Sequence, residues 1–198
     1  MADYIKSRDV IRVMTQTLTP MFEAAGYRRP PKTRACWARP VDEGTVKVCI
    51  VTSRWSRAEL GGGSFNPEVH LAGTDGFVVR WAQLSRCRTQ AALDELREVQ
   101  AAVNARRPQT DWSRMCQRSP TPLGALHLER YTSPDASRYR DGAYVEFDYY
   151  SDADIHAFAG VLERHAVAAL NRFLRNECAT PIVDDGRWDG MFTTIEIV

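Results

Sequence analysis

The sequence predicts an α+β fold, in which helices pack on one face of a mainly antiparallel, curved sheet. Apolar and polar residues alternate in two neighbouring runs, 45–53 and 64–71, as strands with one buried face require. Three longer stretches, 7–25, 89–106 and 152–173, instead repeat apolar residues every three or four positions, as amphipathic helices do. The presence of both periods in one chain predicts the fold class.

The chain has 198 residues and a mass of 22.4 kDa, a size at which one domain can bury a sizeable core. We therefore expect a single domain over residues 1–198. Hydrophobic residues make up 44% of the chain and charged residues 26%, and no apolar run is long enough to span a bilayer. Since the first residues also lack the basic region and apolar core of a signal peptide, we expect a cytoplasmic protein without membrane contact.

Charges are nearly balanced, with 26 basic and 25 acidic residues and a net charge of +1. This balance offers no broad attraction to nucleic acid, so we do not expect nucleic acid as a partner. The cysteines are odd in number, widely spaced and without a CxxC pair, which argues against a disulfide framework and against a zinc site. We expect free, mostly buried thiols at Cys36, Cys49, Cys87, Cys116 and Cys178.

The first helix is expected over residues 7–25. Ser7 can cap its start, and Gly26 suits the left-handed position just past its end, with Tyr27 packing back against the last turn. Pro20 cannot donate to the carbonyl four residues earlier, so we expect a kink or two abutting helical segments at that point.

A β-hairpin is expected after this helix. Its first strand covers residues 33–38 and is closed by Pro40. The turn at 42–44, Asp-Glu-Gly, then leads into a second strand over 45–53, which should pair antiparallel with the first.

Further strands are expected later in the chain. The third, 64–71, contains Pro67, which cannot donate to a ladder, so we expect an edge or a bulge there. A fourth strand is plausible at 77–81, a fifth at 144–150 and a last one at 191–198.

Two more helices have clear starts. Thr89 caps one that ends near residue 106, and Ser151 caps the longest helix of the chain. Between them, four prolines interrupt residues 107–141, which we expect to form an irregular excursion containing one strand near 126–131. The buried face of the longest helix should comprise Ile155, Phe158, Leu162, Ala166, Ala169, Leu170 and Phe173.

Five segments carry a family resemblance: LTPMFEAAGYRR at 18–29, CWARP at 36–40, VKVCIVTSRWS at 46–56, GGSFNPEVHLAG at 62–73 and EFDYYSDADIHAFAGVLERH at 146–165. Together they resemble a bacterial family of uncharacterised proteins, the domain of unknown function numbered 4304. The resemblance implies an α+β fold and a role among bacterial toxin-immunity loci, where several such small families occur. The family brings no settled activity, so no catalytic residue carries over.

One outward strand face offers the best candidate for a small polar site, because Asn66, Glu68 and His70 share it. A solvated sheet face shows the same alternation, and this is the plainer interpretation. The acidic loop 183–190 lacks the spacing of a calcium loop, and the glycines at 61–63 are not followed by the lysine and threonine of a phosphate-binding loop. We therefore expect no cofactor and no metal.

Arginine and tryptophan recur together along the chain, and these residue types dominate binding hot spots. A basic run between residues 28 and 39 also has aromatic neighbours, as a nucleic-acid strip would. Because the net charge is so balanced, contact with an acidic protein or plain solvation is the favoured interpretation. We predict that the contact residues of a binding surface include Arg54, Trp55, Arg57, Arg34 and Trp37.

The absence of a recognisable catalytic set favours a non-catalytic protein that binds another protein. Its most specific form is an immunity or antitoxin-like protein that neutralises a toxin by occupying its surface. The alternative is an enzyme or nucleic-acid-processing protein with its site on the Asn66, Glu68 and His70 face. The sequence leaves the partner's identity and the oligomeric state open.

Overall fold

The computed structural model describes residues 5–52, 62–106 and 147–178, and all structural statements concern these ranges. In chain order their elements are α1 (Ser7–Ala24), β1 (Cys36–Val41), β2 (Gly44–Thr52), β3 (Gly63–Ala72), β4 (Val78–Gln83), the 3-10 helix η2 (Leu84–Cys87), α2 (Gln90–Ala105), β5 (Phe147–Tyr149) and α5 (Asp152–Leu174).

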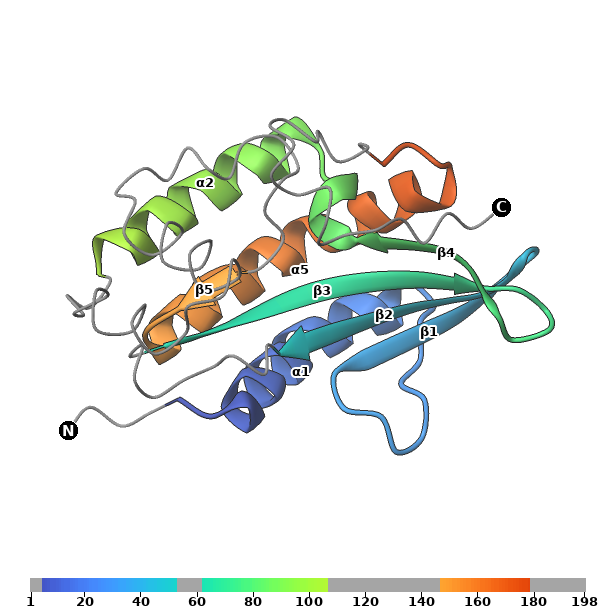
Figure 1. Cartoon of the computed structure of the whole chain (residues 1–198), viewed down its shortest axis with the longest axis horizontal. Coiled ribbons are helices and arrows are strands. Elements are labelled where there is room, and N and C mark those ends of the chain that lie inside the picture. The colour runs from blue at the N-terminus through green and yellow to red at the C-terminus, as the bar shows by residue number, and fades with distance from the viewer. Residues whose placement is uncertain (1–4, 53–61, 107–146, 179–198) are drawn as a thin grey trace, which may run out of the picture.

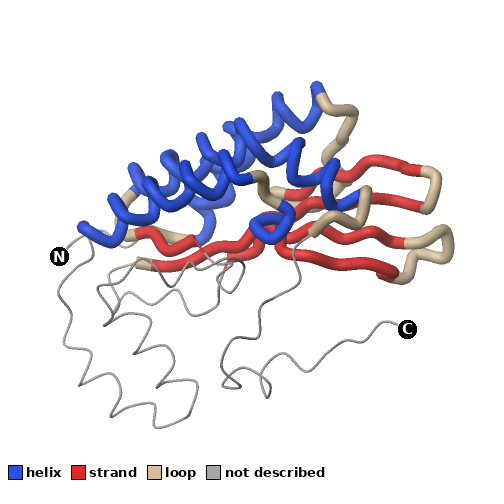
Figure 2. The backbone as a smooth tube through the Cα atoms, turned by 90° about the horizontal axis from the view of Figure 1, so that it is seen from above, coloured by secondary structure: helices blue, strands red, loops and turns tan. Residues whose placement is uncertain are grey.

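The strands form one antiparallel sheet in the order β1-β2-β3-β4, and β5 pairs with the first residues of β3. All three α-helices cover the same face of this sheet (Figure 2). α5 lies in the middle of the helix layer and contacts both α1 and α2 (Figure 1). The predicted α+β fold, with helices on one face of an antiparallel sheet, is confirmed.

The core lies between the sheet and the helix layer. Alternate residues of β2 and β3 face it, and the predicted helix positions bury their side chains against them. The core includes Val46, Val48, Ile50, Phe65, Val69, Leu71, Val10, Met14, Leu18, Phe22, Ile155, Phe158, Leu162 and Phe173. The period of each element therefore predicted its buried face.

The end of α1 follows the prediction, whereas its start does not. Gly26 has a φ of 84°, and the N–H of Tyr27 donates to the carbonyl of Phe22 at 2.9 Å, which closes the helix with a Schellman motif. Ser7 is a helical residue and not the cap. The carboxylate of Asp9 instead accepts the backbone N–H of Lys6 at 3.2 Å. α1 is one continuous helix through Pro20.

The other two helices begin as predicted. The N–H of Ala92 donates to the hydroxyl of Thr89 at 3.3 Å, and the N–H of Asp154 donates to the hydroxyl of Ser151 at 3.2 Å. Asp154 lies in the first turn of α5, where the helix dipole favours a carboxylate.

Both strand prolines occupy positions where the ladder needs no donor. β1 does not stop before Pro40 as predicted. It continues to Val41, because Pro40 lies in an edge strand. Pro67 is opposite Ile50 of β2, while β4 pairs with β3 at Glu68–Ala72 and β5 pairs with it at Gly63–Phe65. The register shift of β3 lies at Leu71 and Ala72 and not at Pro67.

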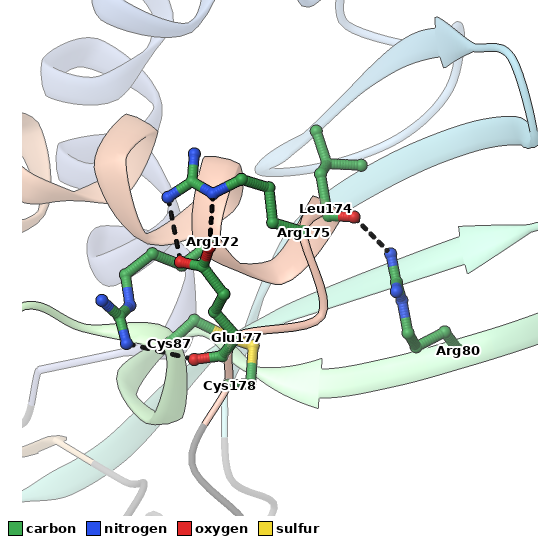
Figure 3. Close-up of a disulfide and its surroundings, with 7 residues drawn as sticks. All are labelled: Arg80, Cys87, Arg172, Leu174, Arg175, Glu177 and Cys178. Atoms are coloured by element: carbon green, nitrogen blue, oxygen red, sulfur yellow. Dashed lines mark hydrogen bonds and ion pairs between the residues drawn. A yellow bond between two sulfur atoms is a disulfide. The ribbon is translucent and has the colours of Figure 1, made fainter.

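The prediction of free thiols is wrong for the four cysteines within the described residues. Cys36 bonds to Cys49, and Cys87 bonds to Cys178 (Figure 3). The first pair joins residues that are directly opposite in the β1–β2 ladder. The second joins η2 to the segment after α5, 91 residues further along the chain. The first pair follows from the register of the β1–β2 hairpin, whereas the second depends on how α5 packs against η2, which linear spacing does not show.

Several predictions lie outside the described residues. They are Cys116, the irregular excursion 107–141, the strand near 126–131, the last strand 191–198 and residues 144–146 of the fifth strand. In the described part of the chain, no helix is long and apolar enough to cross a membrane.

Candidate functional site

The side of the sheet away from the helices, which we call the open face, is the candidate site. Strand alternation turns every second side chain of β2, β3 and β4 to this face, opposite the core residues Val48, Val69 and Ala82. It carries Lys47, Cys49 and Val51 from β2, Ser64, Asn66, Glu68 and His70 from β3, and Trp81 and Gln83 from β4.

The structure brings the three predicted polar residues together on this face. The side-chain amide of Asn66 donates to Oε1 of Glu68 at 3.4 Å, and Oε2 of Glu68 lies 3.4 Å from Nε2 of His70. Asn66 is buried, while Glu68 and His70 are partly exposed. Such a row can orient an imidazole, because the carboxylate favours one ring tautomer.

The open face also exposes apolar side chains near the β3–β4 turn. Trp81 is 41% exposed and lies directly across from His70, with ring centroids 6.4 Å apart. Val79, two residues earlier in β4, is 47% exposed, and Val51 of β2 is 42% exposed. An indole, aliphatic groups and charged groups thus share one side of the sheet, as they do in protein-binding sites.

Of the five predicted contact residues, the structure describes two, Arg34 and Trp37. Arg54, Trp55 and Arg57 lie outside the described residues, and Arg34 is exposed. Trp37 is wrong as a contact residue, because it is fully buried. Its indole N–H donates to the hydroxyl of Thr19 at 3.2 Å, and its ring lies 4.6 Å from that of Phe22.

The basic run between residues 28 and 39 is partly a structural feature of the α1 terminus. The guanidinium of Arg28 donates to the carbonyls of Glu23 and Tyr27, and that of Arg39 donates to the carbonyl of Ala25. Arg39 also lies over the Tyr27 ring at 4.7 Å. Two of the basic residues therefore satisfy carbonyls at the helix end.

Arginines likewise gather at the end of α5, around the Cys87–Cys178 disulfide (Figure 3). Arg80 donates to the carbonyl of Leu174 at 3.2 Å, and Arg175 binds the Glu177 carboxylate with two donors, at 2.7 and 3.0 Å. Arg80 thus satisfies a carbonyl at the negative end of the helix dipole, and Arg175 is paired with a carboxylate, so both arginines have structural partners.

A second carboxylate–imidazole contact, which sequence analysis missed, joins α2 to α5. Nε2 of His165 lies 2.6 Å from Oε2 of Glu95, and Arg164 donates to Oε1 of the same carboxylate. The hydrogen bond from Arg164, with help from His165, lowers the pKa of Glu95. Because the three residues come from two helix surfaces, no local pattern could have shown the contact. It ties the helices together with a surface ion cluster.

Among residues 5–52, 62–106 and 147–178, no three His, Cys, Asp or Glu side chains are placed to hold a metal ion. Comparison of the chain with models of known protein families, with curated proteins and with solved structures found no match.

Proposed function

We propose that this chain is a non-catalytic binding protein that recognises another protein through the open face of its sheet. The observation that carries the proposal is the exposure of Trp81 beside His70 and Lys47 on a face that the described helices leave uncovered. Tryptophan is among the residue types most enriched at binding hot spots.

The most specific form of the proposal is an immunity or antitoxin-like protein of a bacterium, which blocks a toxin by occupying its surface. It draws on the family resemblance of the five segments between Leu18 and His165. A rigid sheet suits this role, since a preorganised surface loses little conformational entropy on binding. The predicted contacts Arg54, Trp55 and Arg57 follow β2 in the sequence and lie outside the described residues.

The test is affinity capture with purified protein, followed by a titration with the captured partner. Trp81→Ala should weaken binding by roughly 2 kcal/mol or more if Trp81 is an anchor. Arg97→Ala, an exposed arginine of α2 on the helix side, is the matched control and should leave the affinity unchanged. A partner held equally by the wild type and by Trp81→Ala would contradict the use of the open face.

The second candidate function is enzymatic, and the contact between Glu68 and His70 is the observation in its favour. In this case His70→Ala would abolish turnover while leaving the protein folded, and no stable protein partner would be captured. Retention of a partner by the His70→Ala variant would favour the binding function.

A cytoplasmic location is part of the proposal, and the two disulfides give it a direct test. Stable disulfides are rare in a reducing cytosol. Alkylation of the protein directly in lysed cells, without reductant, would label Cys36, Cys49, Cys87 and Cys178 if the protein is cytoplasmic and reduced there. Protection of all four would place it in an oxidising compartment instead.

A further inference from the structure

We propose that the Cys36–Cys49 disulfide is a thiol-exchange site, which small thiols open and their disulfides close again while the protein stays folded. The Cys87–Cys178 disulfide has the opposite role and stays intact throughout. The proposal does not rest on the binding function above, since it concerns the two disulfides of this chain alone.

Access from solution distinguishes the two disulfides. Cys36 and Cys49 are partly exposed, and each lies between two buried neighbours in its strand. Strand alternation therefore turns both sulfurs to the open face, away from the helix layer. Cys87, by contrast, is fully buried in the core, and Cys178 packs against that core. A dissolved thiol can approach either sulfur of the first bond but only one sulfur of the second.

The buried position of Cys87 also closes the remaining route to the second bond. A thiol that attacks Cys178 must release Cys87 as a thiolate, and the apolar surroundings of Cys87 disfavour that charge. A thiol that attacks Cys87 must wait until η2 separates from α5, which packs against it. Both routes therefore require local unfolding, whereas neither sulfur of the Cys36–Cys49 bond is buried.

The β1–β2 ladder holds the first pair in place when its bond is open. β1 pairs with β2 along its whole length, and the N–H of Ile50 donates to the carbonyl of Ala35 at 2.8 Å just before it. Cys36 and Cys49 thus form a pair without mutual backbone hydrogen bonds, and their Cα atoms lie 4.1 Å apart. The backbone bonds on either side do not depend on the sulfurs, so the two thiols stay opposite each other and can close again.

Charges near Cys49 permit the approach of a thiolate. Lys47 lies two residues earlier on the same face of β2, where its ammonium group attracts an anion. Glu68 lies opposite Cys49 in the ladder, but its carboxylate is engaged by Asn66 at 3.4 Å and lies 3.4 Å from Nε2 of His70. The negative charge next to the first bond is thus partly compensated.

The arginines near the second bond are already engaged (Figure 3). Arg175 binds the carboxylate of Glu177 with two donors, and Arg172 donates to the backbone carbonyl of Glu177 at 3.1 Å. A free guanidinium beside Cys178 would favour an incoming thiolate. Their engagement therefore leaves the second bond less open to attack than a count of its basic neighbours suggests.

The exchange needs two equivalents of a small thiol, RSH. The thiolate RS⁻ attacks one sulfur of the Cys36–Cys49 bond, which breaks, and the other cysteine leaves as a thiolate and takes up a proton. A second RS⁻ attacks the resulting mixed disulfide and releases the first cysteine, which is also protonated. The small thiols leave as RSSR, so two electrons and two protons pass to the protein. Closure with RSSR is the reverse.

The test is timed alkylation of the oxidised full chain in reduced glutathione, without denaturant, followed by mass mapping of each cysteine-containing peptide. Cys36 and Cys49 should be labelled together, roughly tenfold or more faster than Cys87 and Cys178, and oxidised glutathione should reverse this labelling. Near-ultraviolet circular dichroism should remain that of a folded protein while the first pair is open. Denaturant should bring the two rates together.

Two variants sharpen the measurement. Cys116→Ser removes the fifth cysteine as an exchange partner and should leave the order of opening unchanged. Replacing both Cys36 and Cys49 by serine should leave the second bond as resistant as in the wild type. Equal rates for the two bonds without denaturant, or a first bond that opens only when the protein unfolds, would overturn the proposal. Faster opening of Cys87–Cys178 would overturn it as well.

Discussion

The two edge strands of the sheet, β1 and β4, have very different surroundings. At the β1 edge, the outward N–H of Ala38 donates to the carbonyl of Arg28 at 2.8 Å, and that of Cys36 donates to the carbonyl of Arg34 at 2.7 Å. Pro40, the next outward position, has no N–H at all. At the β4 edge, Val78, Val79 and Trp81 are each more than 40% exposed, and no strand among the described residues pairs with β4 on the side away from β3.

This difference shows how edge protection can be concentrated on one side. The chain turns back at residues 26–28 to cover β1, and a disulfide fixes β1 to β2. Among the described residues, Arg80 holds β4 on its helix side and the Cys87–Cys178 bond fixes the segment just after it.

The largest expected effect on stability comes from removing the Cys87–Cys178 disulfide, which follows β4. Replacing Cys87 and Cys178 together by serine should lower the free energy of unfolding by roughly 4 to 5 kcal/mol, because the bond closes a long loop in the unfolded chain. Replacing Cys36 and Cys49 should lower it less, by roughly 3 kcal/mol at most, since that loop spans only 13 residues of sequence separation. Urea melts under non-reducing conditions measure both. Equal losses would contradict the loop-length argument.

The next effect compares the two tryptophans near the two edges. Trp37→Ala should cost roughly 3 to 5 kcal/mol, because it empties a buried site against Phe22. Trp81→Ala should cost about 1 kcal/mol or less, because a large part of its ring is already in water. Thermal and urea unfolding of both variants at low protein concentration give the comparison. A costly Trp81→Ala would mean that this edge is buried.

The smallest expected effect lies in the helix layer, away from both edges. The pKa of Glu95 is lowered by its hydrogen bond from Arg164, so its contribution to stability is present above the pKa of the unfolded chain and is lost as the pH falls through the folded value. In Glu95→Gln the loss of stability on acidification should be smaller than in the wild type, by about 0.5 kcal/mol for so exposed a pair. Urea melts at neutral and acidic pH measure it. An unchanged pH dependence would show that the pair is not formed in solution.

Much of the fold could be predicted from local patterns. The Schellman end at Gly26, the caps at Thr89 and Ser151 and the buried faces of the helices all depend on residues within a few positions of each other. The register of the β1–β2 hairpin was within reach as well. A turn at 42–44 puts Cys36 opposite Cys49, a consequence that the prediction of free thiols overlooked.

What could not be predicted depends on contacts between distant parts of the chain. Cys87 meets Cys178, and Glu95 meets His165, only after α5 has packed beside α2 and η2. Local sequence patterns also could not predict which of the two tryptophans is buried. Trp37 and Trp81 both lie in strands, but only the sheet order and the position of the helices decide that one is core and the other exposed.

The most direct test of the contrast between the edges is amide hydrogen exchange of Ala38 and Trp81 at low and high protein concentration. The account predicts that the Ala38 amide is protected at both concentrations, since its bond to Arg28 lies within one chain. The Trp81 amide should exchange much faster than that of Ala38, because no strand among the described residues pairs with β4 on the side away from β3. A Trp81 amide as protected as that of Ala38 at the lowest concentration would contradict the account, because the β4 edge would then be covered by the chain itself.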